Sequence, residues 1–130
     1  MKLNIQPQCD NAPKKALIKQ LTIHFASYDI EKAMQCLEDE VVWTLMGDKP
    51  IQGKQNFAAA LKEMSHNKAL ELTIHSIITH GKEAAVNGEM LLENGQTFGF
   101  SDFYQFSSVK GQKVRSILSY VVELNRNTIR

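Results

Sequence analysis

The spacing of the apolar residues changes midway along the chain, and this change restricts the fold more than any other feature of the sequence. Up to Met64, apart from an apolar run over residues 41–46, apolar side chains recur every three or four residues, which is the period of an amphipathic helix. From Leu70 onward they alternate with polar ones, which is the period of a strand with one buried face. Patterns segregated in this way predict an α+β domain, with helices packed on one face of an antiparallel sheet.

Two helices are expected at the start of the chain. Asn11 and Pro13 supply a start signal for a first helix that carries apolar residues as far as Phe25. Asp29 is a typical N-cap for a short second helix, and we expect Asp39–Glu40 to close that helix with charge.

A strand and a third helix are expected next. The apolar run over residues 41–46 predicts a strand that is buried on both faces. A turn over residues 47–50 follows, and Gly53 then opens a helix with Phe57, Leu61 and Met64 in register.

The second half of the chain predicts a four-stranded antiparallel meander. The phase of the first strand slips at Ile77–Ile78, which indicates a bulge. Gly81–Lys82 is a turn, and Asn94–Gly95 is the strongest short hairpin signal in the chain. A loop around Lys110–Gly111 leads to a last strand over residues 114–124.

One residue of the meander does not suit its surroundings. Five residues at period two share a face of the third strand: Phe98, Phe100, Asp102, Tyr104 and Phe106. A carboxylate among aromatic rings is costly unless it finds a partner or takes up a proton. A rise of three units in its pKa would correspond to about 4 kcal/mol.

Two interpretations of Asp102 stay open. It can be a structural acid, hydrogen-bonded to the backbone or to the hydroxyl of Tyr104 or Tyr120. It can also lie in an apolar pocket, where a neutral carboxylic acid is able to hold a developing oxyanion.

Size and charge exclude several classes of protein. The chain has 130 residues, so we expect one domain over residues 1–130, with an N-terminal arm over 1–11 and a core over about 12–125. Fifteen Lys plus Arg residues against fourteen Asp plus Glu give a net charge of +1, so nothing favours nucleic acid or an anionic membrane as a partner. No segment resembles a signal peptide or a membrane span.

The cysteines and histidines carry little functional signal. Cys36 lies within the second helical pattern and Cys9 in the polar arm, and two thiols without a Cys-x-x-Cys motif favour the reducing cytoplasm. His75 and His80 lie five residues apart on one strand without a third ligand in reach, so no metal site is expected. Since no glycine-rich phosphate loop is present, no cofactor is expected either.

Two segments resemble a known family. The first contains Asp29–Glu31, Leu37–Trp43 and Pro50–Lys54, and the second contains Ser101–Phe106 with Lys110–Gly111 and Ser119–Tyr120. Together they resemble the SnoaL-like and ketosteroid-isomerase-like group of the nuclear transport factor two superfamily. The resemblance covers about residues 12 to 125.

This resemblance implies a fold and a range of functions. The fold is a cystatin-like cone, with three N-terminal helices packed on a strongly curved antiparallel sheet and a deep apolar pocket at the open end. It also implies a homodimer through the outer face of the sheet. The superfamily hosts isomerases, cyclases, dehydratases, hydrolases and non-catalytic modules, so the resemblance does not fix the activity.

The resemblance also implies roles for individual residues. Asp102 takes the position of the protonated aspartate that helps to bind the oxyanion in ketosteroid isomerases. The tyrosine and the general base of those enzymes fall at Leu21 and Leu45, so steroid isomerisation by their mechanism is not expected. In the cyclase branch an acid–base aspartate has a His or Asn helper, and His24 is the nearest companion for Asp102. A partly exposed helical histidine is the alternative interpretation of His24.

Epoxide hydrolases of the limonene-epoxide type need an Asp–Arg–Asp set, which the sequence does not assemble. The chain has only Arg115, Arg126 and Arg130. The strand pattern does not decide whether Arg115 faces the side of Ser119, so an Asp102–Arg115 pair stays open.

If the cone forms, nine further residues are candidates for binding a ligand. They are Phe25, Tyr28, Trp43, Leu45, Phe57, Met90, Phe100, Tyr104 and Ser119. Such a lining would suit a small apolar or aromatic molecule, although each residue could equally fill the core. We therefore expect a lyase, isomerase or cyclase that uses Asp102, with a non-catalytic binder or a protein-interaction module as the alternatives.

Overall fold

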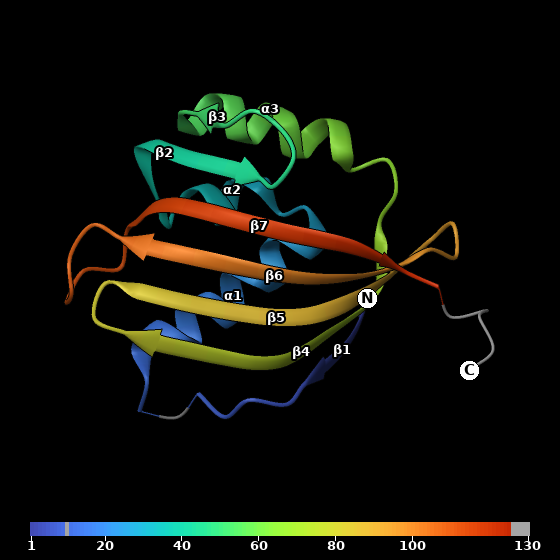
Figure 1. Cartoon of the computed structure of the whole chain (residues 1–130), viewed down its shortest axis with the longest axis horizontal. Coiled ribbons are helices and arrows are strands. Elements are labelled where there is room, and N and C mark those ends of the chain that lie inside the picture. Colours follow the sequence, from blue (N-terminus) through green and yellow to red (C-terminus); the bar gives the residue numbers. More distant parts are fainter. Residues whose placement is uncertain (10, 126–130) are drawn as a thin grey trace.

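The computed structural model describes residues 1–9 and 11–125, so Arg126 and Arg130 lie outside the described residues. Within these ranges three helices cover one face of a seven-stranded sheet (Figure 1). The strands lie in the order β1-β4-β5-β6-β7-β2-β3. The predicted α+β class, with the helices first and the meander second, is confirmed.

The first two helices begin where the sequence signals place them. α1 spans Pro13–Ser27 with proline in its first turn, where the missing N–H costs nothing. α2 spans Ile30–Met34, and the side chain of Asp29 accepts a hydrogen bond from the Lys32 amide at 3.3 Å. Lys32 also lies 3.8 Å from this carboxylate as an exposed ion pair.

The prediction that Asp39–Glu40 closes the second helix is wrong. Both residues belong to β2, which spans Leu37–Leu45 and pairs in parallel with β7. Pairing with a distant strand overrides the helical spacing of the sequence, because local propensity is weaker than tertiary contact. Asp39 instead lies 3.4 Å from Lys54, and Cys36 lies between α2 and β2, partly buried.

β2 is buried on one face and not on both. Val41 and Trp43 are buried, whereas Met46, just after the strand, is exposed. The short β3, Ile51–Gln52, pairs with β2 at the edge of the sheet. Val42 and Thr44, which point to the other face of β2, are only partly buried. α3 spans Lys54–Met64 and follows Gly53, whose φ of 90° suits glycine.

The meander forms as predicted, with a bulge a little earlier than expected. Its strands are β4, β5, β6 and β7, over Ala69–His80, Glu83–Leu92, Thr97–Phe106 and Val114–Leu124. The register of β4 shifts between Ile74 and Ser76, so the bulge precedes Ile77. Gly81 and Gly95 take positive φ angles of 57° and 87° in the two predicted turns.

The edges of the sheet differ from the purely antiparallel expectation. β1, Lys2–Ile5, lies in the segment expected to be an arm and pairs in parallel with β4. At the opposite edge of the meander, β2 pairs in parallel with β7. Both pairings join segments far apart in sequence, which alternation within a single strand cannot reveal.

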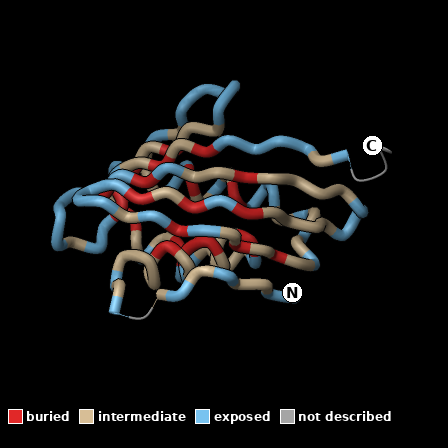
Figure 2. Tube along the Cα trace, turned by 60° about the horizontal axis from the view of Figure 1, so that its bottom comes forward, coloured by how far each residue is buried: buried red, intermediate tan, exposed pale blue. Residues whose placement is uncertain are grey.

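The core lies between the helices and the sheet, where the buried residues gather (Figure 2). Lys14 fixes the start of α1 at one end of this layer. Its Nζ donates to the carbonyls of Gly81, at 2.8 Å, and of Ser108 and Val109, and it lies 4.8 Å from the centre of the Phe106 ring. Among the residues of the two described ranges, no helix has the length and apolar character needed to cross a membrane.

Candidate functional site

A cavity of about 410 Å³ lies between the helices and the sheet. Its size falls within the range of small-molecule sites. Nine of the residues singled out in the sequence line it: Phe25, Tyr28, Trp43, Leu45, Phe57, Met90, Phe100, Asp102 and Ser119.

The sheet wall of the cavity follows from strand alternation. Phe98, Phe100 and Asp102 point to one side of β6 because successive side chains of a strand face opposite sides. On β7, Ser119 lies directly opposite Asp102 and Val121 lies opposite Phe100. Asp102 is therefore placed beyond Phe98 and Phe100, away from the β5–β6 hairpin.

The opposite wall contains a stack of three aromatic rings. Phe57 lies between Phe25 and Trp43, with ring centres 5.6 Å and 4.6 Å away and interplanar angles of 18° and 14°. The stack joins α1, α3 and β2. It makes this side of the cavity apolar, so a charged group nearby is poorly solvated.

Asp102 is the carboxyl group of this cavity, and its surroundings change its acidity. Burial raises the pKa of Asp102 from 3.8 to about 6, because removal of water disfavours the charged form. The Ser119 hydroxyl opposes this rise by stabilising the carboxylate. Trp43 Nε1 donates to Ser119 Oγ at 3.0 Å, which leaves the Ser119 proton available to Asp102.

Tyr104 lies behind the wall and does not line the cavity. It is 2% exposed, and its hydroxyl makes no hydrogen bond in the part of the chain that the structure describes. Burial raises the pKa of Tyr104 well above its usual value, and the nearby Asp102 raises it further. The Thr22 hydroxyl opposes this rise but donates to the Ile18 carbonyl at 2.7 Å, and its geometry toward Tyr104 falls short of a hydrogen bond.

The structure does not bring His24 to the cavity. Thr22, Phe25 and Ala26 are the residues of α1 that line it. At 3.6 residues per turn, His24 lies on the opposite side of the helix from these three. The expected partnership of His24 with Asp102 is therefore not formed.

Three other positions from the sequence are also placed. Leu21 is fully buried in the core and does not line the cavity, whereas Leu45 does. Arg115 is exposed, because the register between β6 and β7 shifts at this point and turns it outward. No ion pair joins Arg115 to Asp102 within the described chain.

Several residues of the lining are not predicted from the sequence, among them Thr22, Asn67 and Gln96. A polar residue beside Leu21 and Phe25 on a predicted helix is a signal that could have identified Thr22. Asn67 and Gln96 lie in loops, where no periodicity places a side chain.

Metal ligands do not gather in the described residues. No group of three or more His, Cys, Asp or Glu side chains in residues 1–9 and 11–125 lies close enough to hold an ion. His75 pairs with Glu89 instead, with 2.9 Å between Nε2 and Oε2.

Comparison with known proteins identifies relatives of this arrangement. A family model described as a SnoaL-like domain matches residues 18–117. No protein with a curated description matches the chain.

Solved structures similar to the chain carry different activities in their descriptions. One, provisionally assigned as a ketosteroid isomerase from Kribbella flavida DSM 17836, has a TM-score of 0.72 and 16% identity over 90% of this chain and 83% of its own. A second, an LEH-like epoxide hydrolase from M. tuberculosis, has a TM-score of 0.70 and 18% identity over 84% and 82%. A third, provisionally assigned as a SnoaL-like polyketide cyclase from Shewanella denitrificans OS-217, has a TM-score of 0.72 and 12% identity over 86% and 92%. At these identities the likeness shows the cone fold alone.

Proposed function

We propose that this chain, which belongs to the SnoaL-like domain family, binds a small apolar or aromatic molecule and transfers a proton to or from it through Asp102. The reaction would be of the lyase, isomerase or cyclase type. Provisional isomerase and cyclase assignments among similar folds support this range without selecting one reaction.

One observation carries the proposal: a carboxyl group with a pKa of about 6 lies in an apolar cavity. With that pKa, about nine-tenths of Asp102 would be ionised at pH 7. A poorly solvated carboxylate is a better proton acceptor than an ordinary aspartate, whose pKa lies further from neutral pH. This balance favours a general base over a neutral oxyanion donor.

A second candidate function is non-catalytic binding of the same kind of molecule. This candidate is supported by the lack of a second acid or base beside Asp102. Apart from Asp102, the lining has no carboxyl, His, Lys, Arg or Cys side chain in the described residues. A protein-interaction module is a weaker alternative, because the cavity is not filled by side chains.

The proposed base can be tested without knowledge of the natural substrate. 5-Nitro-1,2-benzisoxazole is a planar molecule that reports on any positioned base. Removal of its C3 proton breaks the N–O bond and forms a nitrile and a coloured phenolate. We expect catalysis to rise with pH about an apparent pKa near 6, and to fall at least tenfold in Asp102→Asn.

Asp48→Asn is the matched control, because Asp48 is exposed and does not line the cavity. Equal catalysis by wild type and Asp102→Asn would exclude Asp102 as the base. If apolar ligands raise the Tm of both proteins equally and neither catalyses the elimination, the chain is a binder.

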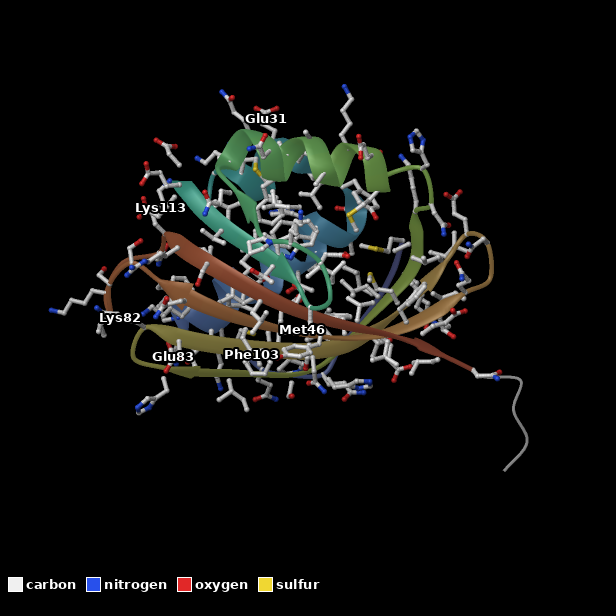
Figure 3. The ribbon with its side chains drawn as sticks, turned by 45° about the horizontal axis from the view of Figure 1, so that its top comes forward. Glu31, Met46, Lys82, Glu83, Phe103 and Lys113 are labelled. Carbon is white, nitrogen blue, oxygen red and sulfur yellow. The ribbon has the colours of Figure 1, made fainter. Side chains whose placement is uncertain are left out.

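The proposal extends to assembly, compartment and domain organisation. We propose a homodimer through the face of the sheet that points away from the helices. Phe103 projects from this face (Figure 3), and its ring meets Tyr120 edge-on with centres 5.9 Å apart. Cys9 and Cys36 are both free thiols, which supports the cytoplasm as the compartment. The chain would act as one domain.

A further inference from the structure

Tyr28 combines three features that core packing alone does not explain. It lines the cavity, it takes a left-handed backbone conformation, and it is only half-buried, so that its hydroxyl is not sealed in the core. It is the first residue after α1 and comes from the helix layer, whereas Asp102 comes from the sheet. The two groups therefore lie on different walls of one cavity.

The backbone of Tyr28 is the first argument. Its φ of 57° and ψ of 37° cap α1 in the left-handed region, a position where glycine or asparagine is usual. A bulky side chain is unfavourable there, because its Cβ crowds the backbone. Residues kept in such conformations cluster at ligand sites, where the side chain has a task that offsets the strain.

The hydroxyl is the second argument. The ring of Tyr28 packs against the core, and a phenylalanine would pack equally well. The hydroxyl group is therefore not needed for packing, and at the lining of the cavity it is accessible to a ligand. Burial raises the pKa of Tyr28 above 10.0, so the group stays a neutral donor at physiological pH.

We propose that Tyr28 is a specificity-determining residue whose hydroxyl donates a hydrogen bond to an acceptor oxygen of the ligand, while Asp102 meets a second polar group. This inference rests on the proposed function, since it requires a ligand in the same cavity. It narrows the ligand class to molecules with two oxygen-containing groups separated by an apolar body. The aromatic stack of Phe25, Phe57 and Trp43 would contact that body.

Matched pairs of compounds test the inference. The probes are 4-methoxyphenol, 6-methoxy-2-naphthol and 4'-methoxybiphenyl-4-ol, which offer three spans between the hydroxyl and the ether oxygen. Each is compared with the analogue in which ethyl replaces methoxy, so that only the acceptor is lost. Affinities of wild type and Tyr28→Phe are measured by isothermal titration calorimetry.

We expect the methoxy compound of at least one span to bind wild type about three- to tenfold tighter than its ethyl analogue, as one neutral hydrogen bond provides. In Tyr28→Phe this preference should disappear, while the affinity for the ethyl compound stays within about twofold. Tyr120→Phe, which removes an exposed phenol outside the cavity, should keep the preference. Circular dichroism checks that each variant is folded.

A preference that survives in Tyr28→Phe, or no preference at any span, overturns the role of Tyr28. In either case, an elimination reaction that is lost in Asp102→Asn leaves the proposed function standing. If none of the six compounds binds wild type, the inference fails, and the elimination reaction decides the proposed function separately.

Discussion

At the scale of single residues, the burial of Asp102 favours the proposed function but lowers the stability of the fold. A lone carboxyl group in an apolar cavity costs free energy when it ionises, and Ser119 offsets only part of that cost. Alternation on β6 was sufficient to single out this residue in the sequence. Alternation could not show that a cavity lies in front of Asp102, because apolar residues such as Phe57 and Phe100 are expected in a filled core as well as in a cavity wall.

The cost of Asp102 predicts an unusual dependence of stability on pH. Its pKa is about 6 in the folded protein against 3.8 without burial, so the folded state holds this proton more tightly. Wild type should therefore lose stability as the pH rises from about 4 to about 6, by up to about 3 kcal/mol from this group. Asp102→Asn, which does not titrate, should be more stable than wild type at pH 7.5 by up to this amount.

Urea unfolding of both proteins at pH 4 and pH 7.5 measures this effect. At pH 4 the gain in Asp102→Asn should shrink to about 0.5 kcal/mol, because Asp102 is protonated in the folded protein and is only about half ionised in the unfolded chain. Asp48→Asn should show no comparable gain, since Asp48 is exposed. A variant less stable than wild type at pH 7.5 would mean that ionised Asp102 stabilises the fold.

At the scale of elements, the pairing of β5 with β6 shapes the cavity wall. Gly88 lies beside Phe100, and a Cβ there would come within 2.9 Å of the Phe100 ring and 2.0 Å of the Thr73 carbonyl oxygen. Only glycine, which has no Cβ, lets the Phe100 ring and the Thr73 carbonyl oxygen approach the backbone of β5 this closely. Strand alternation predicts that Gly88 shares a face with Val86 and Met90, but the contact with Phe100 and Thr73 depends on the register between β4, β5 and β6.

Gly88→Ala should therefore be strongly destabilising. We expect a loss of about 2 kcal/mol or more in the free energy of unfolding, because the backbone carbonyl of Thr73 cannot move aside cheaply. Gly99→Ala is the matched control on β6, where the nearest atoms are 3.5 Å away on the flexible side chain of Leu124. Chemical denaturation measures both, and similar small losses would show that the sheet adjusts easily around Gly88.

The boundary between α2 and β2 shows the limit of prediction from sequence at this scale. The helical spacing of Ala33, Met34 and Leu37 predicts a helix that continues toward Asp39–Glu40, yet Leu37 begins a strand. Leu37 pairs with Val114, which lies far along the chain. A window of neighbouring residues contains no information about such a partner.

At the scale of the whole molecule, the exposed face of the sheet is the main unexplained surface. Ile78, Phe103 and Val122 are 64%, 48% and 63% exposed on the described chain. Their alternation with inward-facing neighbours places them on the side away from the helices. The helices cover only the other face of the sheet, and we propose that a second copy of the chain covers this one.

The proposed dimer predicts that a charge on this face separates the copies. In a two-fold interface each substitution appears twice, so Phe103→Glu would bring like charges together. We expect Phe103→Glu to sediment as a monomer of about half the wild-type mass in analytical ultracentrifugation. Val109→Glu, at an exposed apolar residue in a loop, should leave the dimer intact. A monomeric wild type at micromolar concentration contradicts the proposal.

The central claim is that the apolar surroundings of one acid shift its proton equilibrium toward neutral pH. The most direct measurement is the carbon-13 NMR titration of the side-chain carboxyls in aspartate-labelled protein, with the Asp102 signal assigned by its absence from Asp102→Asn. The account predicts a midpoint near 6 for this signal. A midpoint near 4, as for an aspartate in water, would contradict it.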